Sequence, residues 1–184
     1  MNLSQWVLLL LSLSVALNLY LTFRILRRLD EPPQIPELLP TVPGGPLAAV
    51  IGKSLQGTKL ALGQEGKASA LLFLSSQCPK CREKLPQITE LAELAEPAGL
   101  QLWLVSTESS ARLRRFLAST PLLSRVVRVA ARQHKRLNPT LSSPFYLFVD
   151  HLGQLEAGGH IGDENWQSFA EQMQQIRQEL AASS

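Results

Sequence analysis

The chain has 184 residues, of which 45% are hydrophobic, so it is long enough for one domain with an ordinary core and an appendage. Its two cysteines are too few for a disulfide scaffold, and they are separated by only two residues. A disulfide that closes so small a loop would constrain the unfolded chain little, so it would add little stability. The net charge of +3 is compatible with binding to nucleic acid. Several of the cations, however, follow an apolar N-terminal segment, and positive residues are common at the end of a membrane segment. We therefore expect no nucleic-acid partner.

The apolar N-terminal segment, residues 3–23, contains no charged residue. At about 1.5 Å per residue it would span roughly 30 Å, the thickness of the hydrocarbon layer of a bilayer. A cleaved signal peptide would have a positive start, a shorter apolar run and a small-residue cleavage site. We therefore predict an uncleaved transmembrane helix, which with its basic flank forms an anchor over residues 1–28. A buried helix of a soluble core is the alternative, and the proline-rich stretch that follows disfavours it.

That proline-rich stretch covers residues 29–46, with prolines at positions 32, 33, 36, 40, 43 and 46. Prolines fix backbone angles and remove hydrogen-bond donors, so the stretch is expected to be an extended, semi-rigid spacer that rises about 3.1 Å per residue. A ligand for a proline-recognition module is the alternative. A tether needs no further assumption, and we prefer it.

The rest of the chain, residues 47–184, alternates short apolar runs with segments of helical periodicity. Single strands are predicted at residues 47–52, 69–76, 100–107 and 125–130. Hairpins are predicted at residues 54–62 and from two strands at 144–150 and 155–159. Helices are predicted from the cysteine pair to residue 96, over 109–119, and from Asp163, a good N-cap, onward. This order predicts an α/β sandwich around a mixed sheet.

The two cysteines, Cys78 and Cys81, fall where a buried strand passes into a helix, with Pro79 and Lys80 between them. We expect Cys78 at the N-cap or first position, because Pro79 is tolerated in the first turn of a helix. Free amide donors, the helix dipole and the charge of Lys80 then favour a thiolate at Cys78. Cys81, one turn on, is expected deeper against the strand. This arrangement indicates a pair that cycles between dithiol and disulfide through a mixed disulfide.

A soft-metal carrier is the alternative function, because two thiolates and an imidazole can bind Cu(I) or Zn(II). The histidines available are His134, His151 and His160, and none has a fixed short spacing to the cysteines. We expect His134 and His151 on the solvated surface and leave His160 unassigned, so we predict no metal and no other cofactor. A scaffold with an idle cysteine pair is a third possibility.

Two segments of the sequence resemble the thioredoxin superfamily. FLSSQCPKCREKLP resembles its active-site segment, including Pro86 five residues after the second cysteine, and SSPFYLFVDHLGQLEAGG resembles its cis-proline loop and closing hairpin. With the apolar N-terminus and the spacer, these segments are similar to MauD, a family of methylamine dehydrogenase accessory proteins among the TlpA-like membrane-anchored thioredoxins. The resemblance implies a thioredoxin-like sandwich with a mixed central sheet for residues 47–184, preceded by one N-terminal transmembrane helix.

The resemblance also implies residue roles and partners. Cys78 would be the attacking thiol, Cys81 the resolving thiol and Pro144 the cis-proline, while the backbone of Ser143 would pair with an extended substrate segment. The implied client is an exported disulfide-containing protein such as the small (β) subunit of methylamine dehydrogenase, and a membrane redox partner would donate or accept the electrons. The sequence leaves open whether the pair oxidises, reduces or isomerises its client.

Two positions depart from ordinary thioredoxins. Gln77 replaces the tryptophan that usually precedes the first cysteine, and Leu72 stands where an acidic residue is often buried to help deprotonate the second. These departures indicate a narrower client range or a different redox poise than that of a general reductase.

The predicted orientation in the membrane depends on two signals that disagree. Arg24, Arg27 and Arg28 follow the apolar segment, and the positive-inside rule alone would place the C-terminal domain in the cytoplasm. The resemblance implies the periplasmic side, where disulfides persist. We follow the resemblance and predict a single-pass inner-membrane protein with a periplasmic catalytic domain.

Overall fold

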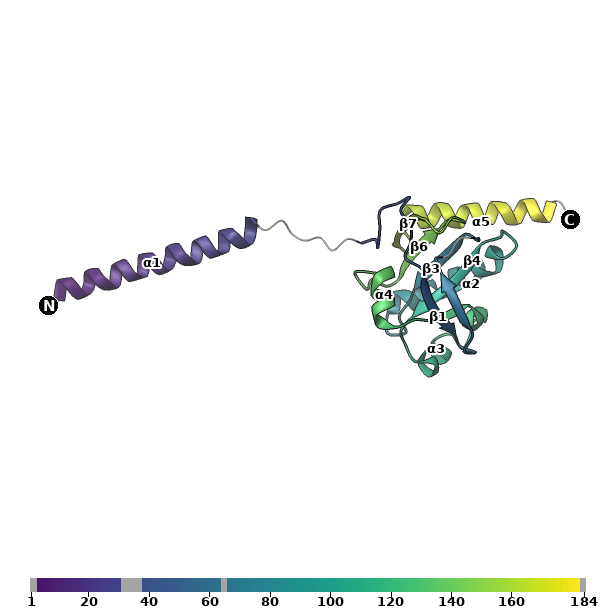
Figure 1. Cartoon of the computed structure of the whole chain (residues 1–184), viewed down its shortest axis with the longest axis horizontal. Coiled ribbons are helices and arrows are strands. Elements are labelled where there is room, and N and C mark those ends of the chain that lie inside the picture. The colour runs from purple at the N-terminus through teal and green to yellow at the C-terminus, as the bar shows by residue number, and fades with distance from the viewer. Residues whose placement is uncertain (1–2, 31–37, 64–65, 183–184) are drawn as a thin grey trace. The chain divides into compact units, whose positions relative to one another are not determined.

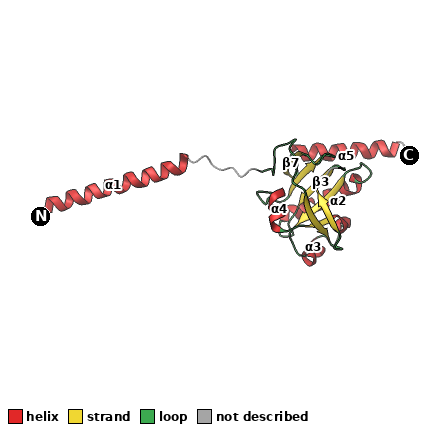
Figure 2. Cartoon of the chain, viewed as in Figure 1, coloured by secondary structure: helices red, strands yellow, loops and turns green. Residues whose placement is uncertain are grey.

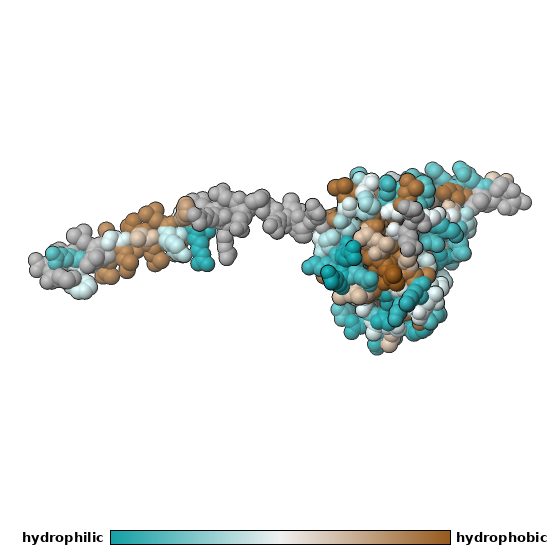
Figure 3. Space-filling model, in the orientation of Figure 1, coloured by the Kyte–Doolittle hydropathy of each residue, from teal (hydrophilic) through white to brown (hydrophobic). Residues whose placement is uncertain are grey.

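The computed structural model describes residues 3–30, 38–63 and 66–182, and the chain divides into two compact units, Met1–Pro36 and Glu37–Ser184. The described part of the first unit is a single helix, α1 (Leu3–Asp30), with apolar side chains exposed along its middle (Figure 3). Among the described residues, no helix has the length and apolar content that a membrane crossing requires. The membrane-spanning role of residues 3–23 therefore stays a prediction.

The second unit is built on a mixed sheet that, within the described residues, has seven strands in the order β2-β1-β5-β4-β3-β6-β7. Figure 2 shows the strands at the centre of this unit with helices around them. The strands are β1 (Val50–Ser54), β2 (Lys59–Leu62), β3 (Ser69–Phe73), β4 (Gln101–Ser106), β5 (Val126–Arg128), β6 (Phe145–Val149) and β7 (Leu155–His160). The helices are α2 (Pro79–Ala95), α3 (Ser110–Phe116), α4 (Ala131–Leu137) and α5 (Glu164–Ala182), with the 3₁₀ helix η1 (Pro121–Arg125).

The predicted α/β sandwich with a mixed sheet is confirmed. The central strands β3, β4 and β5 run parallel to one another, whereas β1, β2, β6 and β7 pair antiparallel with their neighbours. Every residue of β3 is buried, as expected for a strand that is covered on both faces of the sheet. The sequence did not predict α4 or η1, and β1 begins at Val50, later than the predicted strand.

Each face of the sheet has its own hydrophobic core. Alternate residues of β3 enter the two cores, so Leu72 packs with α2, α3 and α5, whereas Leu71 and Phe73 pack on the opposite face with Leu137 of α4. On the first face, Trp166 of α5 is completely buried in the core. Figure 1 shows α5 next to β7. The predicted N-cap of α5 is confirmed: the Asp163 carboxylate accepts a hydrogen bond from the Trp166 backbone N–H at 2.9 Å.

Residues 38–46, which the sequence assigned to the spacer, contact the folded unit, while residues 31–37 of that spacer lie outside the described residues. Gly44 N–H donates to the Leu155 carbonyl at 2.7 Å, and Leu155 N–H donates to the Gly45 carbonyl at 2.9 Å. Leu39 packs over Gly158, where an added Cβ would lie 2.6 Å from the Leu39 side chain. The glycine therefore makes room for this segment against β7.

Candidate functional site

Cys78 lies at the carboxyl end of β3, where the chain turns into α2. It is the N-cap of that helix, with extended backbone angles (φ −90°, ψ 114°), and Pro79 occupies the first helical position. Its sulfur accepts a hydrogen bond from the Cys81 backbone N–H at a distance of 3.3 Å. This sulfur lies at the free amide groups and the positive end of the dipole of α2. The predicted placement of Cys78 is confirmed.

The two cysteines differ in exposure, and both are free thiols in this structure. Cys78 is half-buried, whereas Cys81 is completely buried among the side chains of the first hydrophobic core. Burial, together with the hydrogen bond to Cys78, raises the pKa of Cys81 from 9.0 to about 12. At neutral pH Cys81 is therefore a shielded thiol, and Cys78 is the sulfur that an incoming disulfide can reach.

The loop before β6 brings a proline next to the reactive sulfur. The Ser143–Pro144 peptide bond is cis, which confirms the expected isomer. Cys78 Sγ lies 3.6 Å from the Ser143 carbonyl oxygen, to which the thiol donates. The sequence thus correctly placed two segments 65 residues apart in one site. The roles of Ser143 and Pro144 in binding a client stay predictions.

A buried asparagine holds this cis-proline loop in place. Asn138 is completely buried; its side-chain amide donates to the Ser142 carbonyl at 2.7 Å, and its side-chain carbonyl accepts from Ser142 N–H at 3.0 Å. Between them Leu141 adopts a positive φ of 53° and is 57% exposed. A buried amide with both of its polar atoms satisfied gives the loop one conformation.

Glu108, which follows β4, holds the loop that leads into Cys78. Its carboxylate accepts hydrogen bonds from Ser75 Oγ at 3.2 Å, Ser76 N–H at 2.9 Å and Ser76 Oγ at 2.5 Å. Arg128 Nε in turn donates to the Glu108 carbonyl at 2.9 Å. The sequence reasoning missed Glu108. A signal was present, because parallel strands end at the same edge of a sheet and Glu108 follows the strand next to β3.

A groove of about 330 Å³ opens beside the exposed side of Cys78. It is lined by Ser76, Gln77, Cys78, Pro79, Arg82 and Glu83. Lys80, between the two cysteines, is exposed. Because Gln77 is a polar side chain at the position that usually carries tryptophan, the groove lacks a large aromatic wall there. Tuning of the thiolate by Pro79 and Lys80 stays a prediction.

The histidines do not assemble a metal site with the cysteines. His151 is exposed, as expected, but the prediction of a solvated His134 is wrong: this ring packs edge-on against Phe73 with centroids 5.2 Å apart, and burial lowers its pKa. His160 Nδ1 lies 3.4 Å from the Pro144 carbonyl oxygen. Across the part of the chain that the structure describes, no group of three or more His, Cys, Asp or Glu side chains could hold a metal ion. The soft-metal alternative thus finds no ligand set there.

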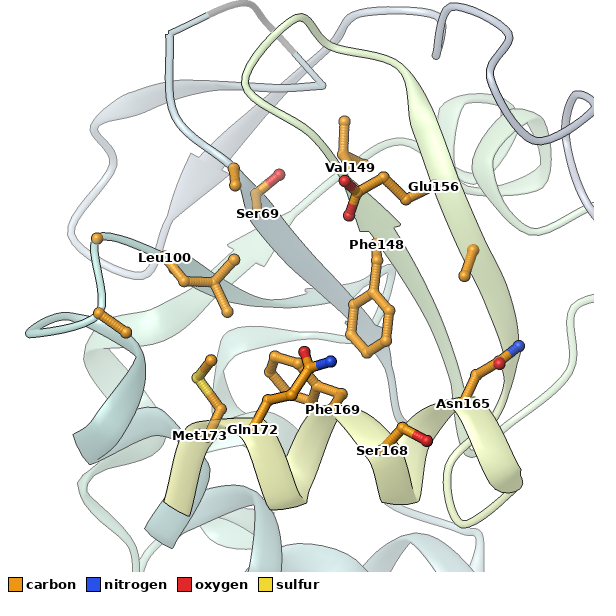
Figure 4. A pocket seen from close by; sticks show the side chains of 14 residues that line it. Ser69, Leu100, Phe148, Val149, Glu156, Asn165, Ser168, Phe169, Gln172 and Met173 are labelled. Atoms are coloured by element: carbon orange, nitrogen blue, oxygen red, sulfur yellow. The ribbon is translucent and has the colours of Figure 1, made fainter. Parts of the chain in front are cut away.

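A second cavity, of about 380 Å³, lies at the amino end of β3, near Ser69 (Figure 4). Phe148, Phe169 and Met173 line it with apolar surface, and Asn165 adds a polar group. Neither cysteine contributes to its walls. Both cysteines lie at the other end of the strand.

Solved structures with similar folds bear on this arrangement. The thioredoxin domain of a thiol-disulfide oxidoreductase from Bacteroides vulgatus matches with a TM-score of 0.61 and 19% identity, covering 72% of this chain and 99% of that one. The chain has a thioredoxin-like fold. A thiol:disulfide interchange protein from Bacteroides sp. matches with a TM-score of 0.62 and 19% identity, over 72% of this chain and 91% of that one.

A peroxiredoxin-like protein from Aquifex aeolicus also has a similar fold, with a TM-score of 0.57 and 13% identity over 75% of this chain and 91% of that one. No family model and no curated protein sequence matches the chain. The similarities therefore establish the fold and nothing more.

Proposed function

We propose that this chain is a thiol-disulfide oxidoreductase in which Cys78 attacks and Cys81 resolves. The observation that carries the proposal is the contrast between the two sulfurs at the start of α2. Cys78 is half-buried, accepts a backbone N–H and borders a groove, whereas Cys81 is completely buried with its pKa raised by burial. A nucleophile must be accessible and anionic, and a resolving thiol must be protected from other reagents until it is needed.

In the reducing direction, the Cys78 thiolate attacks one sulfur of a client disulfide. The client S–S bond breaks, a Cys78–client mixed disulfide forms, and the departing client sulfur leaves as a thiolate. Cys81 gives its proton to that thiolate and attacks Cys78 Sγ, which closes the Cys78–Cys81 disulfide and releases the second client sulfur as a thiolate that takes a proton from water. Two electrons have passed from the pair to the client. The oxidising direction is the reverse of these steps.

The cis-proline loop supplies a surface on which a client segment can lie. Ser143 places its carbonyl oxygen next to Cys78 Sγ, so an extended segment that pairs with the backbone of Ser143 would hold its own sulfur close to the nucleophile. Asn138 keeps this loop in one conformation, which reduces the ordering cost of binding.

On the sequence resemblance alone, we also propose a narrower role. Residues 3–23 would anchor the chain in the inner membrane with the second unit in the periplasm, where it would act on an exported client such as the small subunit of methylamine dehydrogenase. A membrane redox partner would restore the pair after each cycle. Fusing a reporter enzyme that is active only outside the cytoplasm to the C-terminus tests this orientation, and an inactive but expressed reporter would overturn it.

Trapping the mixed disulfide tests the proposed chemistry. The full chain carrying Cys81→Ser, treated with the uncharged bis(2-hydroxyethyl) disulfide, should gain one mercaptoethanol adduct at Cys78 that persists. The wild-type chain should resolve the same adduct to an internal disulfide. A chain carrying Cys78→Ser should remain unmodified at Cys81. Equal modification of Cys81 in that control would contradict the assigned roles.

A further inference from the structure

Charge is distributed unevenly along the second unit. Between Glu108 and Asp150 the sequence has no acidic residue and eight cations, which are Arg112, Arg114, Arg115, Arg125, Arg128, Arg132, Lys135 and Arg136. The segment after it, residues 150–182, has six acidic residues and only Arg177 as a cation. Clustered charges of one sign create a local potential, so this segment is a source of positive potential.

Three of these cations lie on the helix that borders the cysteine site. Arg132, Lys135 and Arg136 are exposed on α4, and hydrophilic surface covers this helix in Figure 3. The buried side of α4 contributes His134 to a cavity of about 120 Å³, whose walls also include Ser75 and residues 141–143. The helix therefore adjoins both the loop that leads into Cys78 and the loop that carries the cis-proline.

No carboxylate of the described part of the chain forms an ion pair with a cation of α4. Among the described residues, the ion pairs are Arg125 with Glu96 and Arg177 with Glu90, and the cations of α4 take no part in them. Arg128, at the end of β5, donates hydrogen bonds to a carbonyl and a hydroxyl group, and it too takes part in neither ion pair of the described residues. An anionic partner could therefore approach this side of the site without displacing an internal ion pair.

Leu141 adds an apolar group to the same side of the site. It is 57% exposed in a left-handed backbone conformation, which a leucine rarely adopts. The hydrogen bonds of Asn138 to Ser142 hold the loop in this state. An apolar side chain held out of the core in this way offers a contact to a bound chain.

We propose that the exposed cations of α4 and Leu141 form a docking surface for an acidic, extended segment of the client protein that carries the disulfide. This inference rests on the proposed function and specifies the partner for the same site. A protein segment is favoured over lipid because α4, which carries the cations, adjoins the loop before Cys78 and the cis-proline loop, where the proposed reaction partner is a protein disulfide. Complementary charge raises the rate of encounter by about 10- to 1,000-fold and orients the partner.

Two synthetic peptides test the charge preference. Each contains one internal disulfide and one leucine beside a cysteine, and they differ only in two flanking residues, which are glutamates in one and lysines in the other. The reduced full chain should exchange at least about tenfold faster with the acidic peptide at low ionic strength, and the preference should collapse in about 0.5 M salt. Equal rates at low ionic strength would overturn the inference.

Charge-reversal variants locate the effect. Arg132→Glu combined with Arg136→Glu should abolish or invert the preference for the acidic peptide. The matched control is Lys67→Glu combined with Arg177→Glu, which makes the same charge change at exposed positions away from α4 and should keep the preference. Loss of the preference in both double variants would show that net charge alone is responsible, and would overturn the assignment to α4.

The uncharged bis(2-hydroxyethyl) disulfide separates the two proposals. Absence of exchange with this reagent would remove the proposed function itself. Normal exchange with it, combined with equal rates for the two peptides, would overturn the docking surface alone. If the peptides show no preference, and binding to phosphatidylglycerol vesicles is lost in Arg132→Glu with Arg136→Glu, the surface belongs to the membrane and the inference fails.

The contribution of Leu141 is tested with a third peptide, an acidic one in which serine replaces the leucine. The wild-type chain should exchange about threefold faster with the leucine peptide, which corresponds to partial burial of one apolar side chain. Leu141→Asn should remove this difference, since asparagine tolerates a positive φ but offers no apolar surface. A difference that survives the substitution would exclude Leu141 from the surface.

Discussion

The two ends of β3 differ in the kind of group that they hold. At the carboxyl end, Cys78 lies between the Glu108 carboxylate network and the cis-proline loop, and hydrogen bonds fix both loops. At the amino end, the cavity near Ser69 is lined largely by apolar side chains such as Phe148 and Met173. Loops that follow parallel strands converge at one edge of a sheet, so polar groups distant in sequence can act together there. We expect exchange chemistry to depend on the first end alone, and stability to depend on both.

The largest effect is expected from Cys78→Ser, which should reduce disulfide exchange by on the order of a thousandfold or more, because a serine hydroxyl cannot replace the thiolate. The unfolding free energy should change little, since Cys78 is only half-buried and serine can still cap α2. Exchange is measured with the full chain and bis(2-hydroxyethyl) disulfide, and unfolding by urea titration. Retained exchange would mean that Cys81 can attack unaided.

A smaller loss is expected when the loop before Cys78 is released. Glu108→Ala removes the carboxylate that accepts hydrogen bonds from Ser75 and Ser76, so the loop that positions Cys78 is no longer fixed. A nucleophile displaced by about 1 Å can react up to a hundredfold more slowly. We therefore expect the exchange rate to fall by roughly tenfold or more. Glu108→Gln keeps one carbonyl oxygen and should recover part of the rate. An alanine variant that folds and exchanges at the wild-type rate would show that Glu108 does not position the site.

A pH-dependent loss of stability is expected from Cys81 in the reduced protein. Its pKa is raised to about 12, so the folded chain keeps a proton that the unfolded chain releases above pH 9.0. This contribution to stability is complete below pH 9 and is lost as the pH rises toward 12. Between pH 8 and about 10.5, urea titration of the reduced wild-type chain should show an extra loss on the order of 1–2 kcal/mol relative to Cys81→Ser. Parallel pH profiles for the two chains would contradict the burial argument.

The smallest effect on exchange is expected at the amino end of β3. Met173→Ala should lower the unfolding free energy by about 2–5 kcal/mol, because it truncates a buried side chain beside the cavity. The exchange rate of the folded protein should stay within about twofold of wild type, well under 1 kcal/mol of activation free energy. A large loss of exchange at temperatures where the variant remains folded would show that the two ends are coupled.

The features that the sequence predicted correctly are those set by local chemistry or by a strong hydrophobic pattern. Asp163 is predicted as an N-cap, and Cys78 as the N-cap or first residue of a helix because Pro79 suits the first turn; the structure makes both of them N-caps. The fully buried β3 was recognisable as a continuous apolar run. The cis Ser143–Pro144 bond was anticipated from its position before a buried strand and from the family resemblance.

The features that the sequence missed depend on contacts between distant segments. Nothing in the sequence near Glu108 shows that its carboxylate binds Ser76, a residue 32 positions earlier, because that pairing follows from the order of the strands. The short helix α4 was missed because it buries one leucine, Leu137, and its N-cap Ala130 makes no side-chain hydrogen bond. Without α4, the packing of His134 on Phe73 could not be foreseen.

The measurement that tests the central claim most directly is alkylation of the reduced full chain with iodoacetamide, with each modified cysteine identified by peptide mass spectrometry. The account predicts rapid modification of Cys78 near neutral pH, while Cys81 stays unmodified until the chain unfolds. Equal modification of both cysteines in the folded protein would contradict it, and so would slow modification of Cys78 at the rate of an ordinary free thiol.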